Sequence, residues 1–296
     1  MLKQYNLVKY GNECFKNDEQ VVARKAGGLN PAVIIPILFA IGVCIYLFVL
    51  GSPGNFKDAD KLGSGSVAFS SVEGKDIHPE SFLGIIYKGG VIVPILITFM
   101  ITVIVFSFER YFVLGKAAGK GNLDNFVVQV RSLLNQNKID EAIEECDRQQ
   151  GSVGNVVKEG LTTYKALSHD NTLNKEQKMV ALNKAIEEAT TLEMPMLEKN
   201  MMILSTLGTV ATLIALLGTV IGMIKAFFAL GSGGGTPDAA ALSTGISEAL
   251  INTALGIGTS AIAIILYNFF TSKIDGLTYK IDEISMSIQQ SFAEFN

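Results

Sequence analysis

The stretch that decides the fold is ALLGTVIGM at residues 215–223, followed after a Gly-rich turn by EALINTALG at residues 248–256. Each stretch lies inside an apolar segment that is long enough to cross a bilayer as a helix. Both stretches carry hydroxyl groups, and the second also carries the carboxylate of Glu248. Such groups are costly when they face lipid. We therefore expect them to face a bundle interior or a pore, and Glu248 is a candidate functional residue.

The composition is typical of a membrane protein. The chain has 296 residues, 49% of them hydrophobic, and a mean hydropathy of +0.36. Its net charge is −4 and no basic patch stands out, which argues against nucleic acid as a partner. The three cysteines, Cys14, Cys44 and Cys146, are expected to be unpaired thiols. The sequence has no spacing typical of a metal site, a phosphate-binding loop or a nucleophile elbow, so we expect neither a cofactor nor enzymatic activity.

Four segments are apolar enough to span the membrane: 31–51, 89–114, 201–230 and 242–272. They predict an all-α polytopic membrane protein whose long transmembrane helices extend into a cytoplasmic helical bundle. The first segment starts late and lacks a convincing cleavage site. We therefore expect a retained helix there rather than a signal peptide.

Lysine and arginine residues predict the orientation, because cytoplasmic flanks carry an excess of them. Cations flank the spans on one side at Arg24, Lys25, Arg110, Lys116, Lys120, Lys199, Lys273 and Lys280, whereas the turn at 231–241 has none. The loop at 52–88 also carries Lys57, Lys61, Lys75 and Lys88, together with acidic residues, which weakens this pattern modestly. We therefore expect three cytoplasmic parts: an N-terminal segment at 1–30, a helical domain at 115–200 and a C-terminal helix at 273–296. The loop at 52–88, with a short amphipathic segment before the second span, is expected on the outer side.

The cytoplasmic part is expected to consist of packed helices, because its apolar residues recur at helical spacing. Asn122 and Asp140 are predicted N-caps, and a helix is expected to start near Asn174. Pro195 predicts a kink in that helix or the point where it reaches the membrane.

Small residues follow one face of each of the last two spans. In the third span they are Gly208, Ala211, Ala215, Gly218, Gly222 and Ala226, and in the fourth they are Gly245, Ala249, Thr253, Gly256, Ser260 and Ala263. Small residues allow membrane helices to approach closely. We therefore predict helix packing at Gly208, Gly218, Gly222 and Gly256.

Hydroxyl groups form a second face of the third span, at Ser205, Thr209, Thr212 and Thr219. Either each hydroxyl bonds a carbonyl of its own helix, or together they line a polar conduit. Beside the small face of the fourth span lie Glu248, Asn252 and Thr259. For Glu248 the alternative to a role in ion passage is a structural hydrogen bond to a neighbouring helix. Lys225 is expected to extend to the outer interface, and spacing alone does not predict a pair with Glu248.

At these residues the chain resembles the MotA/TolQ/ExbB proton-channel family, and ExbB most closely. The resemblance covers about 89–272. It rests on FERYF at 108–112, GTV-x-GM at 218–223, EAL-x-x-TA-x-G at 248–256 and YN at 267–268. The second and third motifs are fairly specific in this order, although either alone is weak.

The resemblance implies long helices that assemble as a pentamer around the single transmembrane helices of an ExbD-like dimer in a bacterial inner membrane. It implies that proton flow does mechanical work on a TonB-like protein for nutrient import, and that the outer loops are periplasmic. Carried over residue by residue, Thr219 and Thr253 line the conduit beside an Asp of the partner, and Glu248 matches the acidic residue at the outer end. With Thr212 and Asn252, these are the predicted proton-pathway residues.

Several alternatives stay open on this sequence. A TolQ-like subunit of envelope constriction and a gliding or flagellar stator are alternatives within the family, and a passive membrane scaffold is an alternative outside it. H⁺ rather than Na⁺ as the transported ion rests mainly on the resemblance. The chain departs from the family at Thr212, where Pro is common, and at Ala215, where the first Gly of the motif stands. The span at 31–51 and the loop at 52–88 exceed a three-span ExbB.

Overall fold

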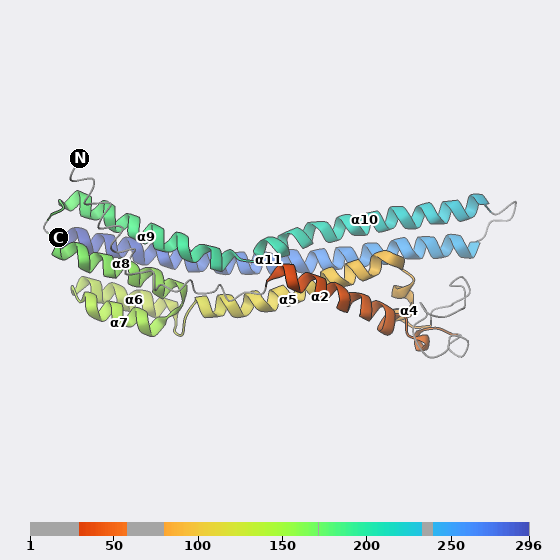
Figure 1. The fold of residues 1–296 in the computed structure, drawn as a ribbon, viewed down its shortest axis with the longest axis horizontal. Helices are drawn as coiled ribbons and strands as arrows, with labels where there is room; N and C mark the ends of the chain where they lie inside the picture. The colour runs from red at the N-terminus through yellow and green to blue at the C-terminus, as the bar shows by residue number, and fades with distance from the viewer. Residues whose placement is uncertain (1–29, 58–79, 171, 233–238, 296) are drawn as a thin grey trace.

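The computed structural model describes residues 30–57, 80–170, 172–232 and 239–295. All regular structure in these ranges is helical, which confirms the predicted all-α fold. As predicted, four helices are long and apolar enough to cross a membrane: Pro31–Leu50, Gly90–Ala117, Met201–Phe228 and Leu242–Phe295. The molecule is elongated, because helix α11 (Ala239–Phe295) runs along its whole length (Figure 1).

The first membrane helix is α2 (Pro31–Cys44), which continues as a π-helical turn, η1 (Ile45–Leu50). Asn30 caps its start by accepting a hydrogen bond from the Ala32 N–H at 3.3 Å. Its Gly42 lies against Thr98 of α5 (Val93–Ala117), where a Cβ would overlap the Thr98 hydroxyl. The additional predicted span is therefore packed on the second span.

Asn55 connects the end of the first span to the segment that precedes the second span. It ends the short helix η2 (Pro53–Asn55), and its amide donates to the carbonyls of Val49 at 2.8 Å and Leu50 at 3.1 Å. Its side-chain oxygen accepts a hydrogen bond from the Ser81 hydroxyl at 2.8 Å. Ser81 in turn caps α4 (Phe82–Tyr87), which leads into η4 (Gly90–Ile92). The end of the first span is thus held beside the start of the second.

The half of the molecule around residues 118–170, 172–200 and the end of α11 is a helical bundle, in agreement with the predicted packing of helices there. The bundle contains α6 (Leu123–Asn135), α7 (Ile139–Gln149), α8 (Gly151–His169) and α9 (Lys175–Glu198). These helices pack around the C-terminal ends of α5 and α11 (Figure 1). A single apolar core runs through these helices. Within it the rings of Tyr164 and Phe292 meet edge to face, with their centroids 4.9 Å apart.

Two of the predicted helix starts are as expected and one is wrong. Asn122 caps α6 by accepting from the Asp124 N–H at 2.9 Å, and Asn174 caps α9 in a capping box with Gln177. Asp140 is not an N-cap, because α7 already begins at Ile139 and Asp140 lies in its first turn. Its carboxylate instead pairs with the ammonium group of Lys165 on α8.

The link between bundle and membrane lies just after Pro195. Helix α9 passes through Pro195 and ends at Glu198, and α10 (Met201–Ser232) begins three residues later. Asn200 turns the chain with a left-handed φ of 63°, a conformation that Asn adopts more readily than most residues. The chain thus leaves α9 for the membrane helix α10 at Asn200, five residues after Pro195.

Candidate ion-pathway site between helices α10 and α11

Helices α10 and α11 lie side by side along their small-residue faces. A Cβ on Gly218 would lie 2.8 Å from the Cβ of Asn252, and one on Gly222 would lie 2.9 Å from the Gly245 carbonyl. A Cβ on Gly256 would lie 2.8 Å from the Ala211 carbonyl, and Gly208 faces Ile264. The four glycines predicted to pack helices therefore all face the partner helix at close range.

Glu248 forms an ion pair across this helix pair. Its Oε1 lies 2.7 Å from Nζ of Lys225 on α10, and its side chain is only 11% exposed, whereas that of Lys225 is 53% exposed. A carboxylate this buried needs a compensating charge, because removal from water disfavours its ionised form. The spacing along the sequence did not predict this pair, which joins residues 23 positions apart.

Asn252 lies one helical turn after Glu248 and is fully buried. It is pressed against Gly218, and both the oxygen and the nitrogen of its amide lack a hydrogen-bond partner within the described part of the chain. Buried amides are nearly always hydrogen-bonded, so this side chain is a costly exception. It marks a polar point inside an otherwise apolar helix interface.

Two of the three pathway threonines, Thr219 and Thr253, use their hydroxyl protons within their own helices. Thr219 donates to the Leu216 carbonyl at 2.7 Å, and Thr253 donates to the Ala249 carbonyl at 3.0 Å. Both side chains, like Thr212, are only partly buried within the chain. For Thr219 this bond fits the simpler of the two interpretations of the hydroxyl face, and the oxygens of both threonines retain acceptor capacity for a further polar group.

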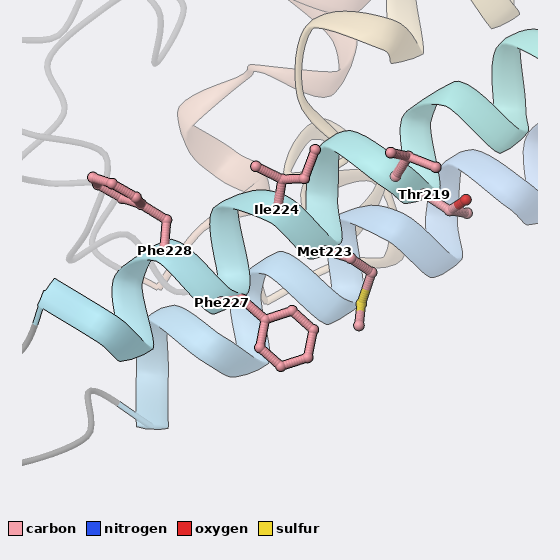
Figure 2. Close-up of a pocket in the computed structure, with 6 residues that line it drawn as sticks. Thr219, Met223, Ile224, Phe227 and Phe228 are labelled. Atoms are coloured by element: carbon pink, nitrogen blue, oxygen red, sulfur yellow. The ribbon is translucent and has the colours of Figure 1, made fainter.

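Thr219 is also the polar edge of a hollow along the second half of α10. Apolar side chains form the rest of its lining: Val220, Met223, Ile224, Phe227 and Phe228. Figure 2 shows Met223 and Phe227 on one side of the helix and Ile224 and Phe228 on the other. Thr219 is the one predicted pathway residue in this lining, whereas Glu248 and Asn252 are buried within the chain.

A second buried ion pair lies at the inner end of α5. Arg110 is fully buried and forms two hydrogen bonds with the carboxylate of Glu109, at 2.8 and 2.6 Å. Its Nη1 also donates at 3.4 Å to the carbonyls of Met196 and Leu197, in the last turn of α9, where helical carbonyls have no partner of their own. Glu109 additionally accepts from the Asn200 amide at 3.2 Å. The two residues thus fasten α5 to the link between α9 and α10.

Residues 149–283 match the MotA/TolQ/ExbB proton channel family. The match runs from the end of α7 through most of α11 and contains Lys225, Glu248 and Asn252. The family resemblance inferred from the sequence is therefore confirmed for this part of the chain. The matching family is one of proton channels and not of enzymes.

Relatives named ExbB and relatives named TolQ are both similar to the chain. An ExbB homolog of Methanothermobacter thermautotrophicus is 31% identical over 153 residues, which are 52% of this chain and 50% of that protein. Biopolymer transport protein ExbB of Xanthomonas campestris pv. campestris is 34% identical over 112 residues, 38% of this chain and 44% of that protein. The chain thus spans about half the length of these ExbB relatives. Tol-Pal system protein TolQ of Pseudomonas aeruginosa is 26% identical over 202 residues, 67% of this chain and 86% of that protein.

Three features near the predicted MotA/TolQ/ExbB-type site were missed from the sequence. They are the pairing of Lys225 with Glu248, the fastening of α9 by Arg110, and the contact of Gly90 with Glu248. For the first two features the sequence offered one signal, a single cation within or beside an apolar segment. Such a charge almost always has a partner. Gly90 carries no chemical signal, so its contact needed the fold.

Proposed function

We propose that this chain is an ExbB-like channel and stator subunit that works with an ExbD-like partner. In this proposal it forms a homo-oligomer, a pentamer, in a bacterial inner membrane, with both termini in the cytoplasm and an ExbD-like dimer in the centre. Proton flow through the assembly does work on a TonB-like protein that drives nutrient import across the outer membrane. The observation that carries the proposal is a buried carboxylate, Glu248, between two helices that match a proton channel family.

The residues of the site support a route for protons rather than a tight binding site. Glu248 lies at the outer end, paired with Lys225, and offers the one carboxylate in the apolar part of the two helices. Thr219 and Thr253 supply hydroxyl oxygens, with Thr212 and Asn252 as further polar groups along the route. Hydroxyl groups both donate and accept hydrogen bonds, so they hydrate or relay a proton without holding it as a fixed charge would. The protonated Asp implied by the family resemblance belongs to the partner.

A TolQ-like role in envelope constriction is the second candidate. It is favoured by the TolQ of Pseudomonas aeruginosa, whose similarity extends over 67% of this chain, whereas that of the Xanthomonas ExbB extends over 38%. The passive scaffold stays as the alternative in which the polar residues only join helices.

Purification of the chain from its native membrane in mild detergent tests the proposal. We expect a small single-span protein with an Asp in its membrane segment to co-purify, in a complex whose mass corresponds to five copies of this chain. An ExbD-like partner together with a TonB-like protein supports the first candidate, and a Tol-type set of partners supports the second. A single chain or an oligomer without such a partner contradicts both.

A further inference from the structure

Besides Lys225, Glu248 has a neighbour in the part of the chain that precedes the family match. The turn η4 leads into the second span, and its first residue, Gly90, has a left-handed φ of 79°. A Cβ on Gly90 would overlap Oε1 of Glu248 and would lie 3.0 Å from its Cδ. The backbone of η4 therefore lies directly on the carboxylate, and only a residue without a side chain permits this contact.

Neighbouring contacts hold η4 in this place. Gly89 lies against Ile251 of α11, where a Cβ would be 3.0 Å from Cγ2 of Ile251. On the other side, the ring of Tyr46 stacks on that of Tyr87 with centroids 4.7 Å apart, and the Tyr46 hydroxyl donates to the Tyr87 carbonyl at 3.2 Å. The outer segment, including the additional first span, is thus built onto the end of α11 that carries Glu248.

The contact accounts for the unequal exposure of the ion pair. The side chain of Glu248 is 11% exposed although its partner Lys225 is 53% exposed. A glutamate has several rotatable bonds, and holding it in one rotamer costs conformational entropy. A rigid backbone surface on the carboxylate restricts those rotamers, so that Oε1 stays on the ammonium group.

We propose that Gly90 is a positioning residue for Glu248, and that η4 keeps the carboxylate on Lys225 and shields it from the outer side. Its importance for ion movement rests on the function proposed above, whereas the contact itself does not. Gly90 begins the second span, and the first span supports this part of the site through the contact of Tyr46 with Tyr87.

A zero-length cross-link measures this arrangement in the purified full-length chain. A carbodiimide adds to the Glu248 carboxyl to form an O-acylisourea. The Lys225 amine then attacks the acyl carbon, an amide forms, and the reagent leaves as a urea. We expect mass spectrometry to find this amide in the unmodified chain and not in Glu248→Gln. We expect Gly90→Ala to lower its yield by about fivefold or more, because a methyl group forces the carboxylate aside. Gly54→Ala is the matched control, since nothing lies within 4 Å of that position.

The outcomes separate this inference from the proposed function, because the cross-link needs neither a partner nor an ion gradient. An undiminished yield in Gly90→Ala overturns the inference, and so does the absence of the cross-link in the unmodified chain. If Gly90→Ala does not fold, the double variant Gly90→Ala with Glu248→Ala decides. If the double variant folds, the defect of Gly90→Ala came from the overlap of its methyl group with the Glu248 carboxylate, which supports the inference. If it still misfolds, the defect came from backbone strain at residue 90, which overturns the inference.

Discussion

Arg110 caps a helix to which it does not belong. Its guanidinium is fully buried, pairs with Glu109 on its own helix, and donates to two carbonyls at the end of α9. A planar guanidinium can bind a carboxylate with two parallel hydrogen bonds and still donate to carbonyls, whereas lysine lacks this fork of donors. At the scale of single residues, the inner end of the membrane region therefore depends on this side chain.

Replacing Arg110 tests that dependence. We expect Arg110→Met to lower the free energy of unfolding by about 3–5 kcal/mol, because it leaves the Glu109 carboxylate buried without its partner. Denaturation of the purified chain in mixed micelles measures the change. Arg148→Met is the control, since Arg148 pairs only on the exposed surface of α7 and its loss should have no measurable effect. Equal stability of the two variants would contradict the structural role of Arg110.

Thr219 and Glu248 can be tested by function. We expect Thr219→Val and Glu248→Ala to assemble normally but to reduce gradient-driven activity by roughly tenfold or more, because each removes a polar group from the proposed proton route. Thr206→Val is the matched control, because Thr206 also bonds its own helix but lies outside that route. Normal activity of both pathway variants in assembled complexes would favour the passive scaffold.

Cys146 is expected to be an unreactive thiol. Burial and the neighbouring Asp147 raise the pKa of the Cys146 thiol from 9.0 to about 12. At pH 8 the thiol is therefore almost entirely protonated, and only the thiolate is nucleophilic. We expect iodoacetamide to alkylate Cys146 at least about a hundredfold more slowly than a cysteine placed by Glu144→Cys on the same helix. Unfolding in detergent should remove the difference, and fast alkylation of the folded chain would disprove the burial.

At the scale of elements, the close approach of α10 and α11 depends on which glycines face the partner helix. Gly256 faces Ala211 and Ala215, whereas Gly258, half a turn further along α11, has nothing within 4 Å in the chain. We expect Gly256→Ala to destabilise the chain by about 1–3 kcal/mol through overpacking. Gly258→Ala should instead be neutral or stabilise by up to about 1 kcal/mol through helix propensity. Unfolding of both variants in mixed micelles gives the comparison, and the opposite order would contradict the helix pairing.

Elements were predictable from the sequence to the extent that they depend on local patterns. Hydropathy over about 20 residues revealed the four spans, and the small-residue spacing indicated the face at which α10 meets α11. The start of α7 was misplaced, because Asp140 is an equally good residue for a cap and for a first turn. The pair of Lys225 with Glu248 and the contact between Arg110 and Met196 depend on how separate helices are aligned, and that alignment is a property of the packed molecule.

At the scale of the whole molecule, the orientation in the membrane is a prediction that labelling can test. In a Cys14→Ser background, we expect an impermeant maleimide to label Gly54→Cys in intact cells. We expect Glu144→Cys to be labelled only after the membrane is opened, because cation-rich flanks stay in the cytoplasm. The buried Cys146 should contribute little background. The reverse pattern would invert the proposed topology, and with it the outer position of Glu248.

The length of α11 has a consequence for any motion at the site. Its 57 residues form one helix that carries Glu248 near one end and Phe292 near the other, about 66 Å apart at 1.5 Å per residue. The α-helix is continuous between these two positions. We therefore expect a rotation of α11 at Glu248 to be transmitted along the helix toward Phe292, whose ring contacts Tyr164 of α8. In the predicted orientation, a change at the outer end of α11 would thus reach the inner bundle through one continuous helix.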